Sequence, residues 1–275
     1  MSDFLYNKSN MLKKIKNPGD IKNLSERELL GLAGDLRKII IETTSKKGGH
    51  LASNLGMIEA TIALHRVFDS PRDSIIFDVD GTIWNSTDVV AQAWNEVLEK
   101  EKIDIRVTAD QLKGLFGRLL PDIAKAILPD QTEAEQLRII DLCCHAEHEL
   151  LREKGAPVYE GLEDTLRELS KRYPLFVVSN CQAGYIELVF EKTGLGKYFT
   201  GHLCPGDTGE AKAANIQTIA KKYELKAPVY VGDTFGDYQA CQEAEVPFVF
   251  ASYGFGQVDT PDYVIEKPMD LLTLF

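Results

Sequence analysis

Carboxylates that follow short apolar runs are the residues of this sequence best suited to chemistry. Asp78 and Asp80 come directly after the apolar run 74–77, and Asp233 follows a later run, with Asp237 four residues further on. Carboxylates gathered in one crevice repel one another. A hard divalent cation such as Mg²⁺ relieves this repulsion, because it binds a few carboxylates together with waters and a phosphate oxygen. The pattern therefore favours a Mg²⁺ cofactor beside a phosphorylated substrate.

A hydroxyl group and an ammonium group accompany these carboxylates. Ser179 and Asn180 follow a third apolar run, and Lys212 opens the helix predicted before Asp233. A lysine and a hydroxyl suit phosphoryl oxygens, because both donate hydrogen bonds to them. Together with the carboxylates, they predict chemistry on a phosphoryl group.

These residues can act together only in a fold that brings strand ends to one edge. Four apolar runs, which alternate with helical stretches, are predicted as strands: 74–77, 175–178, 229–231 and 248–251. The alternation predicts an α/β fold with a doubly wound parallel sheet. Ligands of such sheets bind outside the carboxyl ends of the strands, where the polar residues would meet.

Three parts of the chain differ in pattern. Residues 1–73 have helical spacing of apolar residues and carry 12 Lys and Arg against 9 Asp and Glu, whereas residues 74–275 carry 19 against 33. We expect a core formed by 74–87 and 153–275, where strands and helices alternate. The helix-rich stretch 88–152 lies between the first two strands and is predicted to be an inserted helical cap.

The net charge and the cysteines indicate which classes of binding partner and which cellular compartment to expect. The 275 residues carry a formal net charge of −11, which argues against nucleic acid or an anionic membrane as the main partner. No apolar run approaches the ~18 residues of a membrane span. The five cysteines have no paired spacing and no secretory leader is recognised, so we expect a cytoplasmic protein.

Residues 74–275 resemble the haloacid dehalogenase superfamily of phosphohydrolases, in the subgroup with a helical cap after the first strand. The sequence Asp-Val-Asp-Gly-Thr at 78–82 resembles the first motif of that superfamily, Asp-x-Asp-x-Thr. Ser179 resembles the second motif and Lys212 the third, and Gly-Asp-Thr-x-x-Asp at 232–237 resembles the fourth. Four motifs in order form a specific signal, although each alone is weak.

This resemblance implies a catalytic role for each carboxylate. Asp78 would be the nucleophile that becomes an aspartyl phosphate, and Asp80 the general acid that later acts as base. Asp78, the backbone carbonyl of Asp80 and Asp233 would hold Mg²⁺, with Asp237 supporting the metal shell. Thr82, in the first motif, is expected to contact the substrate.

The resemblance also implies residues that hold the substrate. Ser179 and Lys212 would hold the transferring phosphoryl group, with help from Asn180. Ala213 departs from the pattern, because relatives often have proline after this lysine. Arg118, in the predicted cap, would grip a substrate anion; the alternative is a solvated surface arginine.

Two further features have competing interpretations. Cys143, Cys144, His145 and His148 resemble a metal cluster, but they lie in one helical run without a partner pair elsewhere, so zinc is not expected. Trp84 could face the substrate or belong to the core.

The N-terminal residues resemble a different family. The sequences SKKGGHLASNLG at 45–56 and ALHRVFDSP at 63–71 resemble the N-terminus of 1-deoxy-D-xylulose-5-phosphate synthase, which uses thiamine diphosphate. A strand like 75–79 occurs in both families, so the junction lies where they look alike. No Gly-Asp-Gly cofactor motif follows. We therefore interpret 1–73 as an appendage that packs on the phosphatase or mediates homo-oligomer assembly, with His50, Ser53 and Asn54 as remnants.

These observations favour a Mg²⁺-dependent phosphatase acting on a small phosphorylated metabolite. One alternative is a phosphomutase that uses the same aspartyl phosphate. Another is a non-catalytic assembly or regulatory module built on the synthase-like fragment.

Overall fold

The computed structural model describes residues 11–15, 18–47, 55–67 and 74–275. The chain divides into two compact units, Met1–Asp73 and Ser74–Phe275, which are described separately. The three residues interpreted as remnants, His50, Ser53 and Asn54, lie outside the described residues.

The first unit consists of helices, as its sequence predicts. Its elements are η1 (Met11–Lys14), η2 (Pro18–Asn23), α1 (Glu26–Lys47) and α3 (Ile58–Val67). Ser25 and Glu28 form a capping box at the start of α1, because the Ser25 amide donates to Glu28 Oε2 over 3.0 Å and the Glu28 amide donates to Ser25 Oγ. The buried apolar residues of the unit form one cluster: Met11, Ile21, Leu32, Ala33, Ile58 and Ile62.

The second unit is built on a six-stranded parallel sheet, which confirms the predicted fold class. In sheet order its strands are β3 (Gly201–Leu203), β2 (Leu175–Val178), β1 (Ser74–Phe77), β4 (Pro228–Gly232), β5 (Phe248–Ala251) and β6 (Tyr263–Ile265). Strand β1 lies between β2 and β4, and its Ile76 is paired with Phe176 and Tyr230. All three side chains are fully buried, because helices cover both faces of the sheet.

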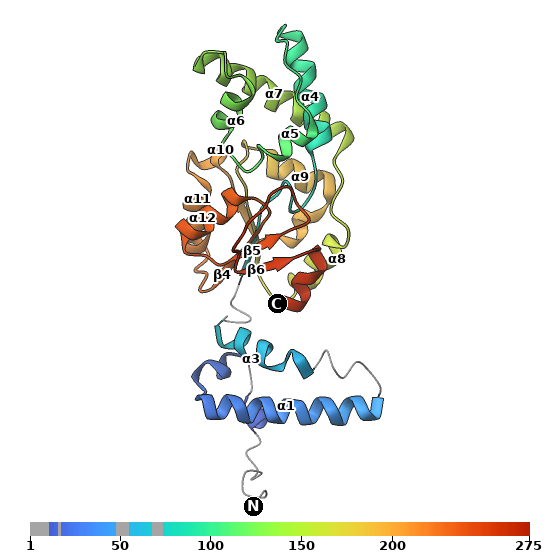
Figure 1. Cartoon of the computed structure of the whole chain (residues 1–275), viewed down its shortest axis with the longest axis vertical. Helices are drawn as coiled ribbons and strands as arrows, with labels where there is room; N and C mark the ends of the chain where they lie inside the picture. The colour runs from blue at the N-terminus through green and yellow to red at the C-terminus, as the bar shows by residue number, and fades with distance from the viewer. Residues whose placement is uncertain (1–10, 16–17, 48–54, 68–73) are drawn as a thin grey trace, which may run out of the picture. The chain divides into compact units, whose positions relative to one another are not determined.

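The helices of this unit lie on both sides of the sheet (Figure 1). Figure 1 shows α11 (Lys212–Lys222) and α12 (Phe235–Ala244) on one side, and α8 (Leu162–Leu169) and α9 (Tyr185–Thr193) on the other. The remaining short elements are η3 (Leu195–Tyr198), α10 (Pro205–Thr208), η4 (Pro268–Asp270) and α13 (Leu271–Leu274).

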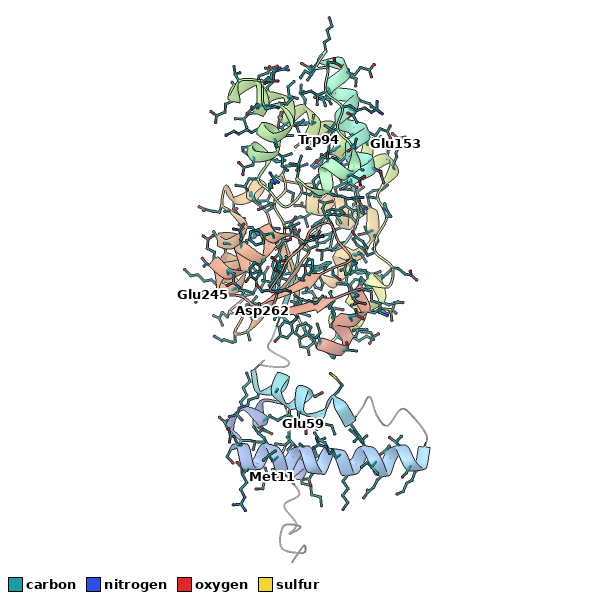
Figure 2. All side chains as sticks on the ribbon, in the orientation of Figure 1. Met11, Glu59, Trp94, Glu153, Glu245 and Asp262 are labelled. Atoms are coloured by element: carbon teal, nitrogen blue, oxygen red, sulfur yellow. The ribbon has the colours of Figure 1, made fainter. Side chains whose placement is uncertain are left out.

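Four helices between β1 and β2 form a separate layer above the carboxyl edge of the sheet (Figure 1). They are α4 (Thr87–Lys100), α5 (Ala109–Lys113), α6 (Leu120–Ile127) and α7 (Glu133–Lys154), and we call this layer the cap. Trp94 lies inside the cap (Figure 2), where it is 2% exposed. Gly155 follows the last residue of α7, and its φ of +68° favours glycine at this position. No helix among the described residues is long and apolar enough to cross a membrane.

Candidate active site

The loop after β1 places Asp78 at the carboxyl edge of the sheet. The Asp78 side chain is buried, and its amide donates to the Val231 carbonyl of β4 over 2.9 Å. Gly81 turns the loop with φ +83°, and a Cβ at this position would lie 2.0 Å from Asp233 Oδ2. Glycine is therefore needed for the first-motif loop to approach Asp233 closely.

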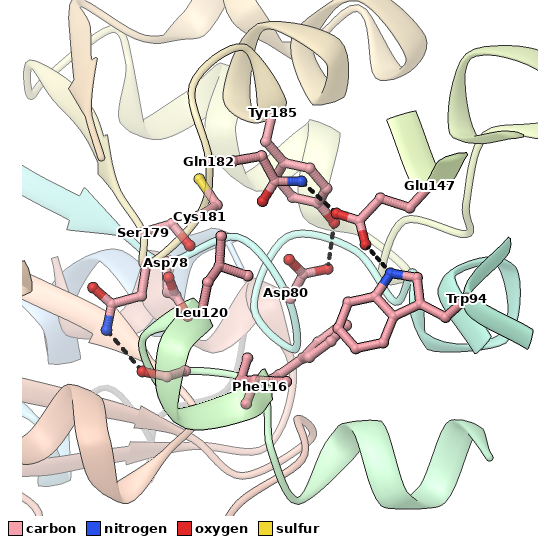
Figure 3. A pocket seen from close by; sticks show the side chains of 13 residues that line it. Asp78, Asp80, Trp94, Phe116, Leu120, Glu147, Ser179, Cys181, Gln182 and Tyr185 are labelled. Carbon is pink, nitrogen blue, oxygen red and sulfur yellow. Dashed lines mark hydrogen bonds between the residues drawn. The ribbon is translucent and has the colours of Figure 1, made fainter. Parts of the chain in front are cut away.

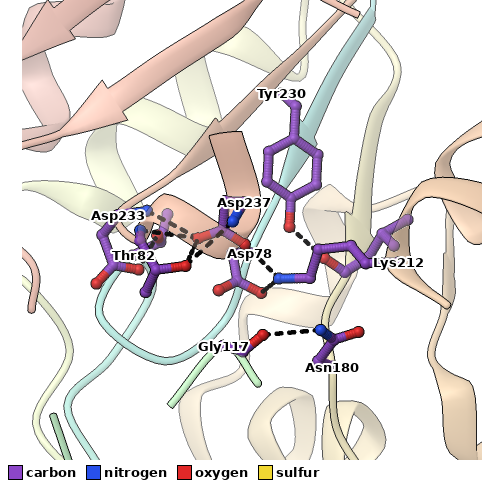
Figure 4. Close-up of polar contacts among 10 residues, drawn as sticks. Asp78, Thr82, Gly117, Asn180, Lys212, Tyr230, Asp233 and Asp237 are labelled. Atoms are coloured by element: carbon purple, nitrogen blue, oxygen red, sulfur yellow. Dashed lines mark hydrogen bonds and ion pairs between the residues drawn. The ribbon is translucent and has the colours of Figure 1, made fainter. Parts of the chain in front are cut away.

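A buried lysine joins two of the carboxylates (Figure 4). Lys212, at the first turn of α11, places its Nζ 3.0 Å from Asp78 Oδ1 and also donates to Asp237 Oδ1. Burial lowers the pKa of Lys212, but the charges of Asp237 and Asp78 raise this pKa by more, so the ammonium stays protonated. The other two lysines of α11, Lys221 and Lys222, are exposed, whereas Lys212 is buried beside the carboxylates.

Three carboxylates gather beside this lysine in an arrangement that fits a metal ion. Oxygens of Asp78, Asp233 and Asp237 lie within 4.8 Å of one another, and all three side chains are buried. Burial raises the pKa of Asp78 and of Asp233, and the charge of Asp237 raises both further. Buried carboxylate oxygens that destabilise one another suit a hard cation such as Mg²⁺.

Asp237 is also part of the α12 N-terminus. Its Oδ2 accepts hydrogen bonds from the amide of Thr234, over 2.9 Å, and from the amide of Asp233, over 3.2 Å. The Thr234 hydroxyl completes a capping box with Asp237. Asp237 therefore fixes the backbone that carries Asp233, in addition to contacting Lys212.

Three donors converge on one oxygen of Asp80. Asp80 Oδ1 accepts hydrogen bonds from Trp84 Nε1 over 3.1 Å, from the Tyr185 hydroxyl over 3.0 Å, and from the Ser86 hydroxyl. Burial raises the pKa of Asp80 to about 7, although these donors lower it. All three of these hydrogen bonds go to Oδ1 and none goes to the other oxygen, Oδ2. Trp84 is fully buried, so it belongs to the core and positions Asp80.

The remaining predicted site residues differ in how they lie. The Ser179 hydroxyl is hydrogen-bonded to the carboxylate of Asp78 and lowers its pKa. Asn180 Nδ2 donates to the Gly117 carbonyl over 2.8 Å, which ties the core to the cap (Figure 4). Thr82 is fully buried and donates to Asp233 Oδ1 over 3.2 Å, so it supports a carboxylate and does not line the pocket.

Arg118 is not brought to the site. Its side chain is exposed and donates from Nη2 to the Gly114 carbonyl over 3.1 Å. It is absent from the described residues that line the pocket, and its expected contact with a substrate anion stays a prediction. The neighbouring Gly117 lines the pocket with its backbone. Glycine is favoured at this position, because φ is +87° and a Cβ would lie 2.7 Å from Thr234 Oγ1.

The pocket opens between the sheet edge and the cap (Figure 3). The core contributes Asp78, Asp80, Ser179, Asn180, Cys181, Gln182 and Tyr185. The cap side contributes Trp94, Phe116, Gly117, Leu120, Ile123 and Glu147. None of these residues is Lys or Arg, so the pocket lining carries carboxylates and aromatic rings without a cationic side chain.

Sequence reasoning missed the cap residues of this pocket, above all Glu147. The acid interrupts an apolar stripe of α7 whose other members include Ile140, Cys144 and Leu151. A carboxylate at such a position is a signal that could have been found. His148, which was grouped with the cysteines, stacks on Tyr185 with ring centroids 5.7 Å apart.

Comparison with known proteins assigns the second unit to a family. The model of haloacid dehalogenase-like hydrolases matches residues 75–251, which is more than half of the chain. A haloacid dehalogenase-like hydrolase from Streptococcus pneumoniae is 22% identical with a TM-score of 0.63, covering 73% of this chain and 96% of its own. A predicted phosphoglycolate phosphatase from Haemophilus somnus is 21% identical with a TM-score of 0.65 and the same coverages. CbbY from Rhodobacter sphaeroides, solved with xylulose-(1,5)bisphosphate, has a TM-score of 0.60 at 15% identity, covering 72% and 95%.

The first unit has different relatives. The model of the N-terminal part of 1-deoxy-D-xylulose-5-phosphate synthase matches residues 12–85 and overlaps the other family model at 75–85. The synthase of Heliobacterium modesticaldum is 59% identical over 69 residues, which cover 25% of this chain and 11% of the synthase. That of Syntrophotalea carbinolica is 44% identical over 107 residues, covering 39% and 15%. The chain thus spans only a small fraction of these relatives, and the overlap lies at the predicted junction.

Proposed function

We propose that this chain, which belongs to the haloacid dehalogenase-like hydrolases and carries a synthase-like N-terminal segment, is a Mg²⁺-dependent phosphatase of a small phosphorylated metabolite. The observation that carries the proposal is the pairing of Asp78 and Asp80 in one pocket. Asp78 is held by a lysine and a serine, while Asp80 keeps one oxygen clear of its three donors.

The two carboxylates divide the chemistry between them. A carboxylate oxygen of Asp78 attacks phosphorus, and the bond between phosphorus and the leaving oxygen breaks. Asp80 Oδ2 donates its proton to that leaving oxygen, so the product departs as an alcohol. Asp80 then accepts a proton from the water that attacks the aspartyl phosphate, which releases inorganic phosphate and restores the carboxylate of Asp78 and the protonated acid of Asp80. With its pKa raised to about 7, Asp80 suits both donation and acceptance.

The remaining site residues would orient the phosphoryl group and hold the metal ion during these steps. Lys212 and Ser179 contact Asp78 and would orient the phosphoryl oxygens that approach it. Asp78, Asp233 and the Asp80 carbonyl would hold Mg²⁺, with Asp237 fixing the backbone of Asp233. When bound, the cation would neutralise the negative charge of the phosphoryl group and the carboxylates.

The pocket favours hydrolysis over the phosphomutase alternative. A mutase must hold a sugar bisphosphate and therefore a second phosphate group away from the nucleophile. Arg and Lys are the usual partners of such a group, and neither lines this pocket among the described residues. We therefore favour a phosphatase.

Release of phosphate from a panel of phosphate esters with Mg²⁺ tests this function. The wild-type protein should release phosphate only with the metal, and Asp78→Asn should abolish release. Asp130→Asn is the matched control, because Asp130 is exposed on the cap and should leave the rate unchanged. Phosphate release by purified Asp78→Asn at the wild-type rate would overturn the proposal.

A further inference from the structure

A buried carboxylate of the cap faces the pocket and is unused by the proposed mechanism. Glu147, on α7, is 5% exposed and lines the same pocket as Asp80 (Figure 3). Its Oε2 accepts a hydrogen bond from Trp94 Nε1 over 2.6 Å, and its Oε1 accepts one from Gln182 Nε2. Both partners are donors, so each carboxyl oxygen of Glu147 acts as a hydrogen-bond acceptor in this arrangement.

No cation compensates this carboxylate in the described structure. Its partners are an indole and an amide, and the pocket lining includes no Lys or Arg. His148 lies next to Gln182, but burial lowers the pKa of its imidazole. Burial raises the pKa of Glu147 to about 8 even though both hydrogen bonds lower it, and the charge of Asp80 raises it further. A buried carboxylate of this kind is costly unless a cation reaches it.

We propose that Glu147 receives an ammonium group on the leaving alcohol, so that the substrate is the phosphate monoester of an amino alcohol. The inference rests on the proposed phosphatase function and names the substrate class of that site. The phosphate would lie at Asp78 and the ammonium group at Glu147, at opposite ends of one pocket. The cap thereby selects the leaving group while the core performs the transfer.

Two other features of the lining fit a cationic group that donates hydrogen bonds. Trp94, Phe116 and Tyr185 line the pocket, and aromatic rings attract ammonium groups. Asn180 Oδ1 is a buried acceptor without a hydrogen-bond partner, and Asn180 lines the same pocket. A ligand with N–H or polarised C–H groups would meet acceptors and rings at several points.

The same lining disfavours the other leaving groups. A carboxylate or second phosphate would face the Glu147 carboxylate without a cationic partner in the pocket lining, which disfavours its binding. A neutral polyol could be bound by amide groups alone. It would not offset the free-energy cost of burying the Glu147 carboxylate.

Matched esters and one isosteric variant test the inference. The ligands are 2-aminoethyl phosphate, which is cationic at its far end, n-propyl phosphate, which is neutral and of similar size, and phosphoglycolate, which is anionic. Binding is measured by calorimetry with Mg²⁺ on Asp78→Asn, which keeps the pocket but should not consume the ligand. We expect 2-aminoethyl phosphate to bind at least about tenfold more tightly than n-propyl phosphate, and phosphoglycolate to bind most weakly.

The variant Glu147→Gln, made on the same background, should remove the preference for the ammonium ester. Glu149→Gln is the control, because Glu149 is exposed two residues along the same helix and should keep the preference. Equal binding of the cationic and neutral esters by the Asp78→Asn protein would overturn the inference, even if Glu147→Gln fails to fold. Failure of the phosphatase function appears differently, as absent turnover of every ester by the wild-type protein.

Discussion

Asp80 illustrates how hydrogen bonds orient the carboxyl group that we propose as the proton donor. Trp84, Ser86 and Tyr185 all donate to Oδ1, and this arrangement leaves Oδ2 as the oxygen that can carry a proton toward the pocket. Burial keeps that proton available near neutral pH, because it raises the pKa of Asp80 to about 7. The four motifs indicated that Asp80 is a candidate acid, but not which neighbours orient it.

Asp80→Asn should slow hydrolysis according to the leaving group. For an alkyl phosphate we expect a loss of about 10²- to 10⁴-fold in kcat/KM, which excludes the later step in which Asp80 acts as base, because the poor leaving group needs the proton. For p-nitrophenyl phosphate the loss should be much smaller, since its phenolate leaves without protonation. Steady-state rates on both esters check this. Equal losses on the two esters would mean that Asp80 acts other than as the acid.

Glu147 should make stability depend on pH. Burial raises its pKa from 4.5 to about 8, so the folded protein binds this proton more tightly than the unfolded chain. The stability contributed by the protonated group is fully present below the unfolded pKa and is lost as pH rises toward the folded pKa, by on the order of 1 kcal/mol per pH unit. Glu147→Gln lacks this loss, so the Tm of the variant relative to wild type should rise from about pH 5 to about pH 8. A Tm difference that stays constant between these pH values would contradict this prediction. Glu149→Gln is the control, because Glu149 is exposed and its variant should show no such pH dependence.

At the scale of the element, the backbone geometry of the loop after β1 determines how closely this loop approaches Asp233. Gly81→Ala would place a Cβ 2.0 Å from Asp233 Oδ2 in a loop with φ +83°. We expect a loss of stability of about 1–3 kcal/mol from the backbone alone, and loss of activity because Asp233 must move. Gly34→Ala, in α1, is the control, since nothing lies within 4 Å of its Cβ and a helical alanine should be neutral or stabilising. Thermal unfolding and phosphate release are measured on both variants. A Gly81→Ala protein that keeps its stability and activity would contradict this prediction.

The elements that the sequence predicted are those with strong local signals. Strands β1, β2, β4 and β5 were predicted because consecutive apolar residues are buried on both faces of a parallel sheet. Strands β3 and β6 were missed, because each has only three residues; those of β3 are all half-buried, and those of β6 range from exposed to buried. The pocket side of the cap was missed for a related reason: Glu147 is placed by how the helices pack, and it lies in no recognisable motif.

At the scale of the whole molecule, the chain joins two units with different relatives. The synthase-like match ends at residue 85 and the hydrolase match begins at 75, so the families overlap around β1. All four motifs that resemble the hydrolase superfamily lie after Ser74. The first unit also keeps large apolar side chains exposed, among them Leu30 at 73%.

A protein that begins at about Asp73 should therefore keep its chemistry and lose other properties. We expect kcat on a good small substrate to stay within about tenfold of the full chain, a barrier change near 1.4 kcal/mol. Solubility, stability or oligomeric state should change instead, because exposed apolar residues commonly cover a partner surface. Phosphate release and light-scattering mass are measured on the same preparation. A folded truncated protein of unchanged oligomeric state but without activity would show that the first unit shapes the active site.

The most direct test of the central claim is the detection of phosphate on Asp78 during turnover. The wild-type protein is mixed with Mg²⁺ and a hydrolysed ester, quenched in acid and analysed by peptide mass spectrometry. We predict a phosphorylated aspartate in the peptide that contains Asp78, and none in Asp78→Asn. Steady turnover with no phosphate on that peptide, together with turnover by Asp78→Asn, would contradict the account.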